Sequence, residues 1–410
     1  MAKYLTDELE LQSVANAIRA KGGTSESLAF PSGFVSAIEG ISAGGGDSTV
    51  ENGLVTRTIS EYTNSEITSV GSYAFYYYTS LTTISFPVCT DIESNAFNNC
   101  YNLLSAYFPE CTNIGTNAFR SCSSLTTINF PMCTKISGYA FNGCQGLTTA
   151  SFPACTSIDI SAFNGCYSLV TANFPLCTTI GNFAFAYCRN LTTINFPACT
   201  YIGNSAFQSC SSLTTANFPV CTNVAASAFR SCINLTTVSF PACTSIDSNA
   251  FHHCYSLTTA NFPVCTTIGS SAFSACTNLS TISFPLCTNI SNYAFYNCAS
   301  LAMVNFPTCM NIGSSAFGYG YILTTISFPA CTNIGVGAFD HCYHLLSAYF
   351  MGSSIPVLQN SNAFSSTPIA GLTTNTSGVY GSIYVPASML ESYKTATNWS
   401  YFSDRFVGVE

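Results

Sequence analysis

The side chains of this sequence that could do chemistry are first of all its 23 cysteines. They form two columns that alternate every 11 residues, starting at Cys89 and Cys100, with Gly320 as the one gap. A thiol can join a disulfide, bind a metal or act as a nucleophile. Neither a Cys-x-x-Cys pair nor a cysteine and histidine cluster at zinc spacing occurs. The count is odd, so at least one thiol stays unpaired.

The spacing of the cysteines argues against disulfides. If identical units stack in register, equivalent Cβ atoms lie about 5 Å apart, whereas a disulfide needs about 3.8 Å. We therefore expect buried free thiols that pack as small hydrophobic groups. Free thiols also fit a protein that folds in a reducing cytoplasm.

The other reactive side chains are sparse. The only histidines form the pairs His252-His253 and His341-x-x-His344. They could hold a metal, but we favour exposed turn residues. Carboxylates are too few to suggest an acid and base pair, and no nucleophile elbow, P-loop or dinucleotide glycine motif is present. We therefore predict no catalytic residue, no cofactor and no metal, and a protein that is not an enzyme.

A strict internal repeat positions all of these residues. The phenylalanine of a Phe-Pro pair recurs every 22 residues from Phe86 to Phe328, and a second phenylalanine follows the same step. Around Phe86 the sequence reads L-x-x-I-x-F-x-x-C-x-x-I, which resembles the leucine-rich-repeat segment. Ile84 and Phe86 alternate with polar residues, as in a short strand, and Pro87 ends it. We predict a right-handed leucine-rich-repeat solenoid of the α/β type.

The predicted solenoid has about 13 rungs of 22 residues, with short parallel strands on two walls and little helix. Its Leu, Ile, Phe and Cys columns form the core, because no unit can bury its apolar face without its neighbours. The solenoid covers residues 49–350, including an N-terminal cap rung.

The flanking segments depart from the repeat. Residues 1–42 read as a small helical attachment module, followed by a Gly-rich linker at 43–48. Such a module is too small to be stable alone, so we expect it to dock on a partner or to self-associate. Residues 351–410 form a C-terminal cap, with a helix over 387–397 that packs against Trp399.

Composition limits the partners. Only 7% of the residues are charged, and no basic patch exists, so nucleic acid and anionic membrane surfaces are poor partner candidates and we expect neither nucleic-acid binding nor membrane insertion. No apolar run is long enough for a membrane helix. The N-terminus lacks the apolar segment of a secretory signal, so we expect cytoplasmic synthesis.

Two surfaces remain for binding. One strand face carries a column of Ser and Asn beside a column of Thr, which could bind carbohydrate or could simply stabilise stacking; an ice-binding array is a third alternative. The other surface consists of the variable turns, whose exposed aromatic and arginine side chains are typical of interface hot spots. The candidate ligand-binding residues in these turns are Tyr139, Phe183, Tyr187, Arg189, Tyr201, Arg230, Tyr255, Tyr293, Tyr296 and Tyr319.

The repeat unit LTTISFPxCTxIGxxAFxxC resembles the BspA-like leucine-rich repeats of bacterial and protozoal surface proteins. The resemblance covers residues 67–350 and implies adhesion to host proteins, glycans or other cells. The segments SVANAIRAKGG and LAFPSGFVSAI, within residues 9–41, resemble tail-associated proteins of phages and prophages from gut Gram-positive bacteria. The terminal segment YVPASMLESYKTATNW is similar to the closing segment of both groups.

Two functions follow from these resemblances. In the first, the chain is a phage or prophage tail component that is made in the cytoplasm, joins the virion through residues 1–42 and recognises a bacterial surface. In the second, it is a bacterial cell-surface adhesin for a host protein or glycan. The missing signal peptide and wall anchor favour the first. Either protein could be a homo-oligomer.

Overall fold

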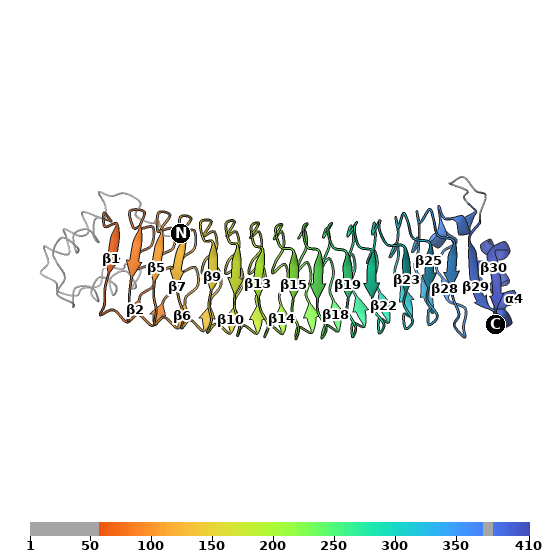
Figure 1. The fold of residues 1–410 in the computed structure, drawn as a ribbon, viewed down its shortest axis with the longest axis horizontal. Helices are drawn as coiled ribbons and strands as arrows, with labels where there is room; N and C mark the ends of the chain where they lie inside the picture. The colour runs from red at the N-terminus through yellow and green to blue at the C-terminus, as the bar shows by residue number, and fades with distance from the viewer. Residues whose placement is uncertain (1–56, 372–379) are drawn as a thin grey trace, which may run out of the picture.

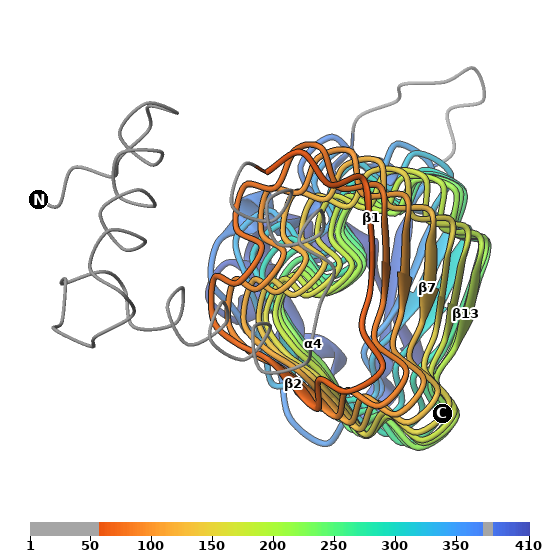
Figure 2. The same ribbon diagram turned by 90° about the vertical axis from the view of Figure 1, so that its left-hand side faces the viewer.

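The computed structural model describes residues 57–371 and 380–410, which coil into one elongated solenoid (Figure 1). Viewed from its N-terminal end, the coil has one wall that carries β1, β7 and β13 and a second wall that begins with β2 (Figure 2). The predicted module at 1–42 and linker at 43–48 lie outside the described residues.

The first wall consists of strands of three residues, in which the middle side chain points inward. Pro87 and its equivalents remove a backbone donor directly after the inward-facing phenylalanine, so each strand stops at a corner. These strands are β1 (Glu61–Thr63), β3 (Thr83–Ser85), β5 (Ser105–Tyr107), β7 (Thr127–Asn129), β9 (Thr149–Ser151), β11 (Thr171–Asn173), β13 (Thr193–Asn195), β15 (Thr215–Asn217), β17 (Thr237–Ser239), β19 (Thr259–Asn261), β21 (Thr281–Ser283), β23 (Met303–Asn305), β25 (Thr325–Ser327) and β27 (Ser347–Tyr349).

The second wall is one continuous parallel sheet of 14 strands, close to the expected number of rungs. Equivalent residues pair in register, as Asp91 does with Asn113. Its strands are β2 (Ser69–Val70), β4 (Asp91–Ile92), β6 (Asn113–Ile114), β8 (Lys135–Ile136), β10 (Ser157–Ile158), β12 (Thr179–Ile180), β14 (Tyr201–Ile202), β16 (Asn223–Val224), β18 (Ser245–Ile246), β20 (Thr267–Ile268), β22 (Asn289–Ile290), β24 (Asn311–Ile312), β26 (Asn333–Ile334) and β28 (Val357–Leu358).

The first wall, by contrast, is divided into four sheets, with breaks after β7, β13 and β21. The inward-facing residue before each break is an isoleucine that is only half-buried: Ile128, Ile194 and Ile282. At these breaks the stacked Phe-Pro rings spread to 6.0–6.1 Å between centroids, against 5.2 Å between Phe86 and Phe108. Isoleucine alone does not open the ladder, because Ile84 and Ile326 occupy the same position fully buried in unbroken pairs.

A third ladder of hydrogen bonds runs along the turns that close each coil. The amides of Asn95, Phe97 and Asn99 donate to carbonyl oxygens of the next rung at 2.8–2.9 Å. Asn95 and Asn99 have φ of 61° and 64°, and the equivalent two positions are left-handed in the other rungs. The left-handed residues orient the amides of Asn95, Phe97 and Asn99 toward the next rung. The conformation of the turns is therefore held by hydrogen bonds between rungs.

The core is a stack of identical side chains. Phe97 and Phe119 stack with centroids 5.1 Å apart, and the other rungs repeat this contact. All 23 cysteines are free and buried, which confirms the prediction. Their thiols are also hydrogen-bonded: Cys111 Sγ donates to the Asn113 carbonyl at 3.2 Å, and Cys144 Sγ donates to the Phe119 carbonyl at 3.1 Å.

The C-terminal cap extends the first wall by two strands and closes the core. It contains the 3-10 helices η1 (Ser361–Phe364), η2 (Pro368–Ala370), η3 (Ala387–Met389) and η4 (Trp399–Arg405), the helix α4 (Leu390–Thr395), and the strands β29 (Ser382–Pro386) and β30 (Phe406–Val409). Trp399 is buried against Phe350 and Tyr393, as predicted, and its Nε1 donates to the Pro356 carbonyl at 2.7 Å.

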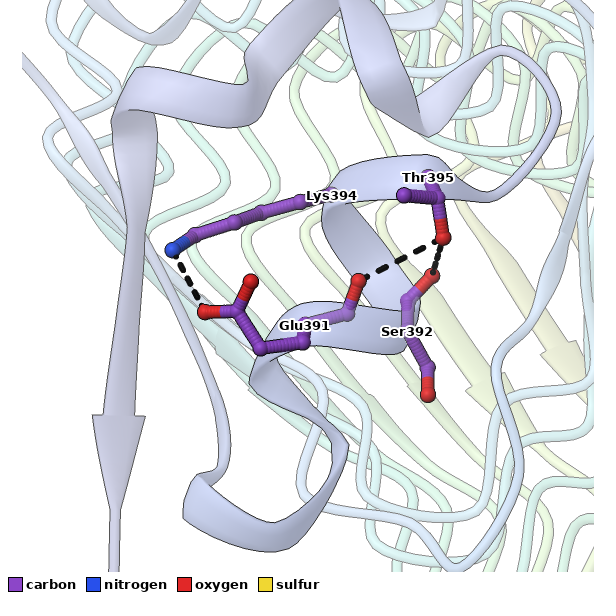
Figure 3. Close-up of polar contacts among 4 residues, drawn as sticks. All are labelled: Glu391, Ser392, Lys394 and Thr395. Atoms are coloured by element: carbon purple, nitrogen blue, oxygen red, sulfur yellow. Dashed lines mark hydrogen bonds and ion pairs between the residues drawn. The ribbon is translucent and has the colours of Figure 1, made fainter.

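The predicted helix over 387–397 is shorter than expected. Its first residues form η3, and α4 ends at Thr395 because Ala396 is extended and Asn398 is left-handed. On its exposed side Lys394 pairs with Glu391 at 2.8 Å, and Thr395 Oγ1 donates to the carbonyl oxygens of Glu391 and Ser392 (Figure 3). No helix among residues 57–371 and 380–410 is long and apolar enough to cross a membrane.

Candidate binding surface

Half of the predicted ligand-binding residues occupy the left-handed positions of the turns. Tyr139, Phe183 and Tyr293 directly precede the Ala-Phe pair of their rungs, whereas Tyr187 and Tyr319 directly precede the second cysteine column or its gap; their φ values are 56–63°. A left-handed conformation costs a bulky L-residue about 1–2 kcal/mol, and glycine and asparagine avoid most of this cost. Other rungs do place Asn, Ser or Gly there. The aromatic residues therefore occupy positions at which the left-handed backbone favours glycine or asparagine.

The remaining predicted residues lie at three different places. Arg230 and Tyr296 lie between the two left-handed positions, and Arg189 and Tyr255 follow the second cysteine column, so all four belong to the turns. Tyr201 does not. It lies in β14, on the second wall, where its side chain is exposed. The prediction that Tyr201 belongs to a variable turn is wrong, because its repeat position is that of the first residue of the second-wall strands, in register with Thr179 of β12.

The structure brings three of the predicted residues together near the C-terminal end. The ring centroids of Tyr293 and Tyr296 are 5.6 Å apart, and those of Tyr296 and Tyr319 are 5.1 Å apart. Three further rings continue this group across the next rung. We call the set the C-terminal aromatic cluster: Tyr293, Tyr296, Tyr319, Tyr321, His341 and Tyr343.

Sequence reasoning missed His341 and Tyr343 as members of this cluster. Both were detectable, because His341 follows Tyr319 by one repeat and Tyr343 follows Tyr321 by one repeat. A second missed group lies at the N-terminal end, where Tyr73, Tyr76, Tyr77 and Tyr101 make a chain of edge-to-face and tilted contacts at 5.6–5.8 Å.

Arginine and aromatic side chains also meet between the two ends. The Arg189 guanidinium lies 5.4 Å from the centroid of the Tyr167 ring, and that of Arg120 lies 5.8 Å from the Tyr139 ring. Gln208 Nε2 donates to the Tyr187 hydroxyl at 3.3 Å. An exposed cation–π contact contributes about 0.5–1 kcal/mol, which favours the orientation of the arginine over the ring.

The surroundings of His252 and His341 differ. Burial, followed by the charges of His253 and Arg230, lowers the pKa of His252 to about 4, so its ring is neutral at neutral pH. His341 Nδ1 lies 2.9 Å from Asp340 Oδ1, without hydrogen-bond geometry. This contact becomes an ion pair only when the imidazole is protonated.

The described residues offer little for metal or covalent chemistry. Among residues 57–371 and 380–410, no group of three or more His, Cys, Asp or Glu side chains could hold a metal ion. Burial raises the pKa of the Cys177 and Cys221 thiols to about 11, away from the range in which a thiolate nucleophile forms at neutral pH.

Some of the polar side chains on the two walls form hydrogen bonds between rungs. Asn195 Nδ2 donates to Asn173 Oδ1 at 2.7 Å on the first wall. At the corner before the second wall, Thr112 Oγ1 donates to the Thr90 carbonyl of the preceding rung at 3.1 Å, a contact that recurs along the coil. These bonds support the interpretation that such columns stabilise stacking. The side chains of the turns vary more from rung to rung than those of the two walls.

Comparison with known structures finds other leucine-rich-repeat proteins. A leucine-rich repeat protein from Bacteroides ovatus is 22% identical, with a TM-score of 0.39, and the match covers 63% of this chain and 82% of that one. A leucine rich cell surface protein from Faecalibacterium prausnitzii is 26% identical, with a TM-score of 0.40, covering 68% and 84%. The pneumococcal vaccine antigen PcpA is 13% identical, with a TM-score of 0.42, covering 86% and 90%.

No curated protein sequence matches the chain. A family model does. The model described as "BspA type Leucine rich repeat region (6 copies)" matches residues 57–170, 134–258 and 244–370. These overlapping matches span the whole coil, including the two walls, the stacked phenylalanines and the turns, so the chain belongs to the BspA-type leucine-rich-repeat family.

Proposed function

We propose that this protein is a non-enzymatic binding scaffold that recognises a cell-surface protein or glycan through the aromatic and arginine side chains of its turns. One observation carries the proposal. Tyr139, Phe183, Tyr187, Tyr293 and Tyr319 hold left-handed conformations that Asn or Gly would adopt at lower cost. Residues kept in unfavourable conformations are concentrated at functional sites.

The chemistry of these turns suits recognition. Tyrosine and arginine are enriched at interface hot spots because they bury a large area while keeping a polar end. The rigid stack of rungs holds them in a fixed arrangement, so little order has to be imposed on binding. The turns therefore present these side chains in a preorganised arrangement.

For its biological setting, we propose a phage or prophage tail protein that recognises a bacterial surface, with residues 1–42 binding other tail components. The resemblance of that segment to tail-associated proteins supports this setting, and the 23 free, buried thiols fit assembly in a reducing cytoplasm. The second candidate is a bacterial cell-surface adhesin, which membership of the BspA-type family favours. Mass spectrometry of purified virions distinguishes them, because only the first places the protein in the particle.

Binding itself is tested with the fluorescently labelled full-length chain on whole bacterial cells and on host epithelial cells. We expect saturable binding to one of them and a loss of at least about tenfold in the double variant Tyr293→Asn, Tyr319→Asn. Tyr107→Asn is the control, because Tyr107 is as exposed as Tyr293 but lies on the first wall. Saturable binding that only Tyr107→Asn weakens would place the binding site on the first wall and refute recognition through the turns.

A further inference from the structure

A polar hollow lies on the second wall near the C-terminal end of the coil. Its volume is about 530 Å³, and its lining residues come from five successive rungs. Its lining consists of Ser270, Asn289, Ile290, Ser291, Asn292, Asn311, Ile312, Gly313, Ser314, Asn333, Gly335 and Gln359. No lining residue carries a charge.

The hollow coincides with a run of asparagines in one repeat column and with glycines in a neighbouring column. Asn289, Asn311 and Asn333 pair in register on β22, β24 and β26, the one place in the described coil where three successive rungs have asparagine at this position. Gly313 and Gly335 lie two residues after the second and third of these asparagines and contribute no side chain. A Cβ on Gly313 would lie 2.4 Å from the backbone nitrogen of Asn292. The stacked rungs therefore leave no room for a side chain at this position.

The lining keeps much of its hydrogen-bonding capacity free. Asn311 is exposed and makes no side-chain hydrogen bond to any other described residue. Asn292 Oδ1 accepts from the Ser314 amide at 2.8 Å, which leaves its own amide donors available. Asn333 Oδ1 meets Gln359 Nε2 only at 3.4 Å. Each amide side chain offers two donors and an acceptor, so the hollow presents both kinds of group side by side.

This lining selects against most ligands. The only apolar side chains, Ile290 and Ile312, are buried in the core, so the hollow has no pocket for the apolar anchors that dominate peptide binding. A phosphate or a nucleic acid would need Lys or Arg, and the lining has neither. A neutral sugar fits, because every hydroxyl both donates and accepts.

We propose that this hollow, which we call the asparagine groove, binds a neutral glycan. The proposal rests on the proposed function, since it names the ligand class for a surface-binding protein. The in-register asparagines present the same amide on successive rungs, so the groove suits an extended oligosaccharide better than a single sugar.

The test measures binding of the full-length chain to neutral hexasaccharides (maltohexaose, cellohexaose, mannohexaose and N-acetylchitohexaose) by saturation-transfer NMR and isothermal titration calorimetry. Hexagalacturonate serves as the charged comparison. We expect at least one neutral oligosaccharide to bind and the charged one not to bind. Absence of binding across the neutral panel overturns the proposal.

Two variants locate the site. Asn311→Asp and Asn311→Leu should each weaken binding by about tenfold or more, the effect of losing one or two hydrogen bonds. The same column has Asp91 and Val357 in other rungs, so both variants are compatible with the fold. Asn223→Asp is the matched control, because Asn223 occupies this column outside the groove and bonds to Ser245. Equal affinity in all three variants overturns the proposal.

The same preparations are tested for binding to whole cells, which separates the two proposals. Cell binding without binding to any neutral oligosaccharide refutes the asparagine groove and leaves the proposed function standing. Oligosaccharide binding that depends on Asn311, together with no binding to any cell, supports the groove and refutes the wider proposal.

Discussion

The imidazole ring of His341 stacks face to face on the phenol ring of Tyr319, with centroids 4.4 Å apart and planes within 4°. The two residues occupy the same repeat position on adjacent rungs, and both are left-handed, with φ of 60° and 59°. The identical backbone conformation gives both side chains the same direction, so the rings stack at the spacing of the rungs. The turns can therefore build a continuous aromatic surface across rungs.

This stack should appear as an energetic coupling between the two residues. In a double-mutant cycle with Tyr319→Asn and His341→Asn, we expect a coupling free energy of about 0.5–1.5 kcal/mol, the usual value for an aromatic pair. Urea unfolding monitored by circular dichroism measures it. Additive effects of the two substitutions would show that the rings do not stabilise each other.

Phe183→Asn should separate stability from binding. Phe183 is left-handed, with φ of 56°, and exposed, and asparagine tolerates this conformation. We expect the free energy of unfolding to rise by about 1 kcal/mol as the backbone strain is relieved. We also expect weaker binding to cells, since the proposed function depends on such side chains. A variant that loses stability would mean that the phenyl ring contributes more through packing than its conformation costs.

Phe207→Ala should lower the free energy of unfolding, in contrast to Phe183→Asn. Phe207 is fully buried and stacks on Phe185 and Phe229 with centroids 5.4 and 5.2 Å apart. Truncation removes the ring from two stacks and leaves a cavity, so we expect a loss of about 3–5 kcal/mol in the free energy of unfolding. Phe183→Ala is the surface control, with a much smaller change expected. Equal losses at both positions would contradict the assignment of Phe207 to the core.

Acid should destabilise the turn that contains His252. Its folded-state pKa is about 4, below the ordinary value of 6.5. Below pH 6.5 the unfolded chain binds a proton that the folded chain does not, so stability falls as the pH drops from about 6.5 to 4. His252→Gln should flatten this dependence in urea unfolding measured over that range. His344→Gln is the control, because His344 is exposed.

The regular features of this structure could be predicted from the sequence, and the irregular ones only in part. The step from Phe86 to Phe108 predicts the rungs, the two walls and the buried columns, because a constant spacing without insertions permits one stacking. The left-handed turns were not predicted. Asn95 and Gly143 belong to the two left-handed columns and are a signal for them, but tyrosine at Tyr139 or Tyr319 obscures it. Conformation there is imposed by hydrogen bonds between rungs, which lie 22 residues apart.

The candidate sites depend even more on neighbouring rungs. The C-terminal aromatic cluster forms because aromatic residues in four columns coincide on adjacent rungs, and comparing columns could have identified His341. The asparagine groove was not predicted. It requires a glycine without a side chain beside Asn311, and that hollow is a property of the space between rungs rather than of any one residue. The extent of α4 also depends on the cap, where Asn398 Nδ2 donates to the Leu358 carbonyl at 2.7 Å.

The buried thiols should make the protein sensitive to alkali. Burial raises the pKa of Cys89, Cys177 and Cys221 to about 11, from an ordinary value of 9.0, and raises the pKa of Cys144 well above that value. Above pH 9 the unfolded chain releases thiol protons that the folded chain keeps, so the unfolded state binds fewer protons and the free energy of unfolding falls as the pH rises. The stabilisation is complete below pH 9 and is lost progressively toward pH 11 and beyond.

Because many thiols act together, this loss should be steep. Each thiol contributes up to about 1.4 kcal/mol per pH unit above pH 9. Urea unfolding at successive pH values between 8 and 11 measures the slope, and replacing Cys155, Cys177, Cys199 and Cys221 by alanine should reduce it. The four substitutions lie on consecutive rungs, so the variant must also keep its circular dichroism spectrum at pH 8. If the slope is unchanged, tyrosine ionisation rather than the thiol columns governs alkaline unfolding, since burial also raises the pKa of Tyr62.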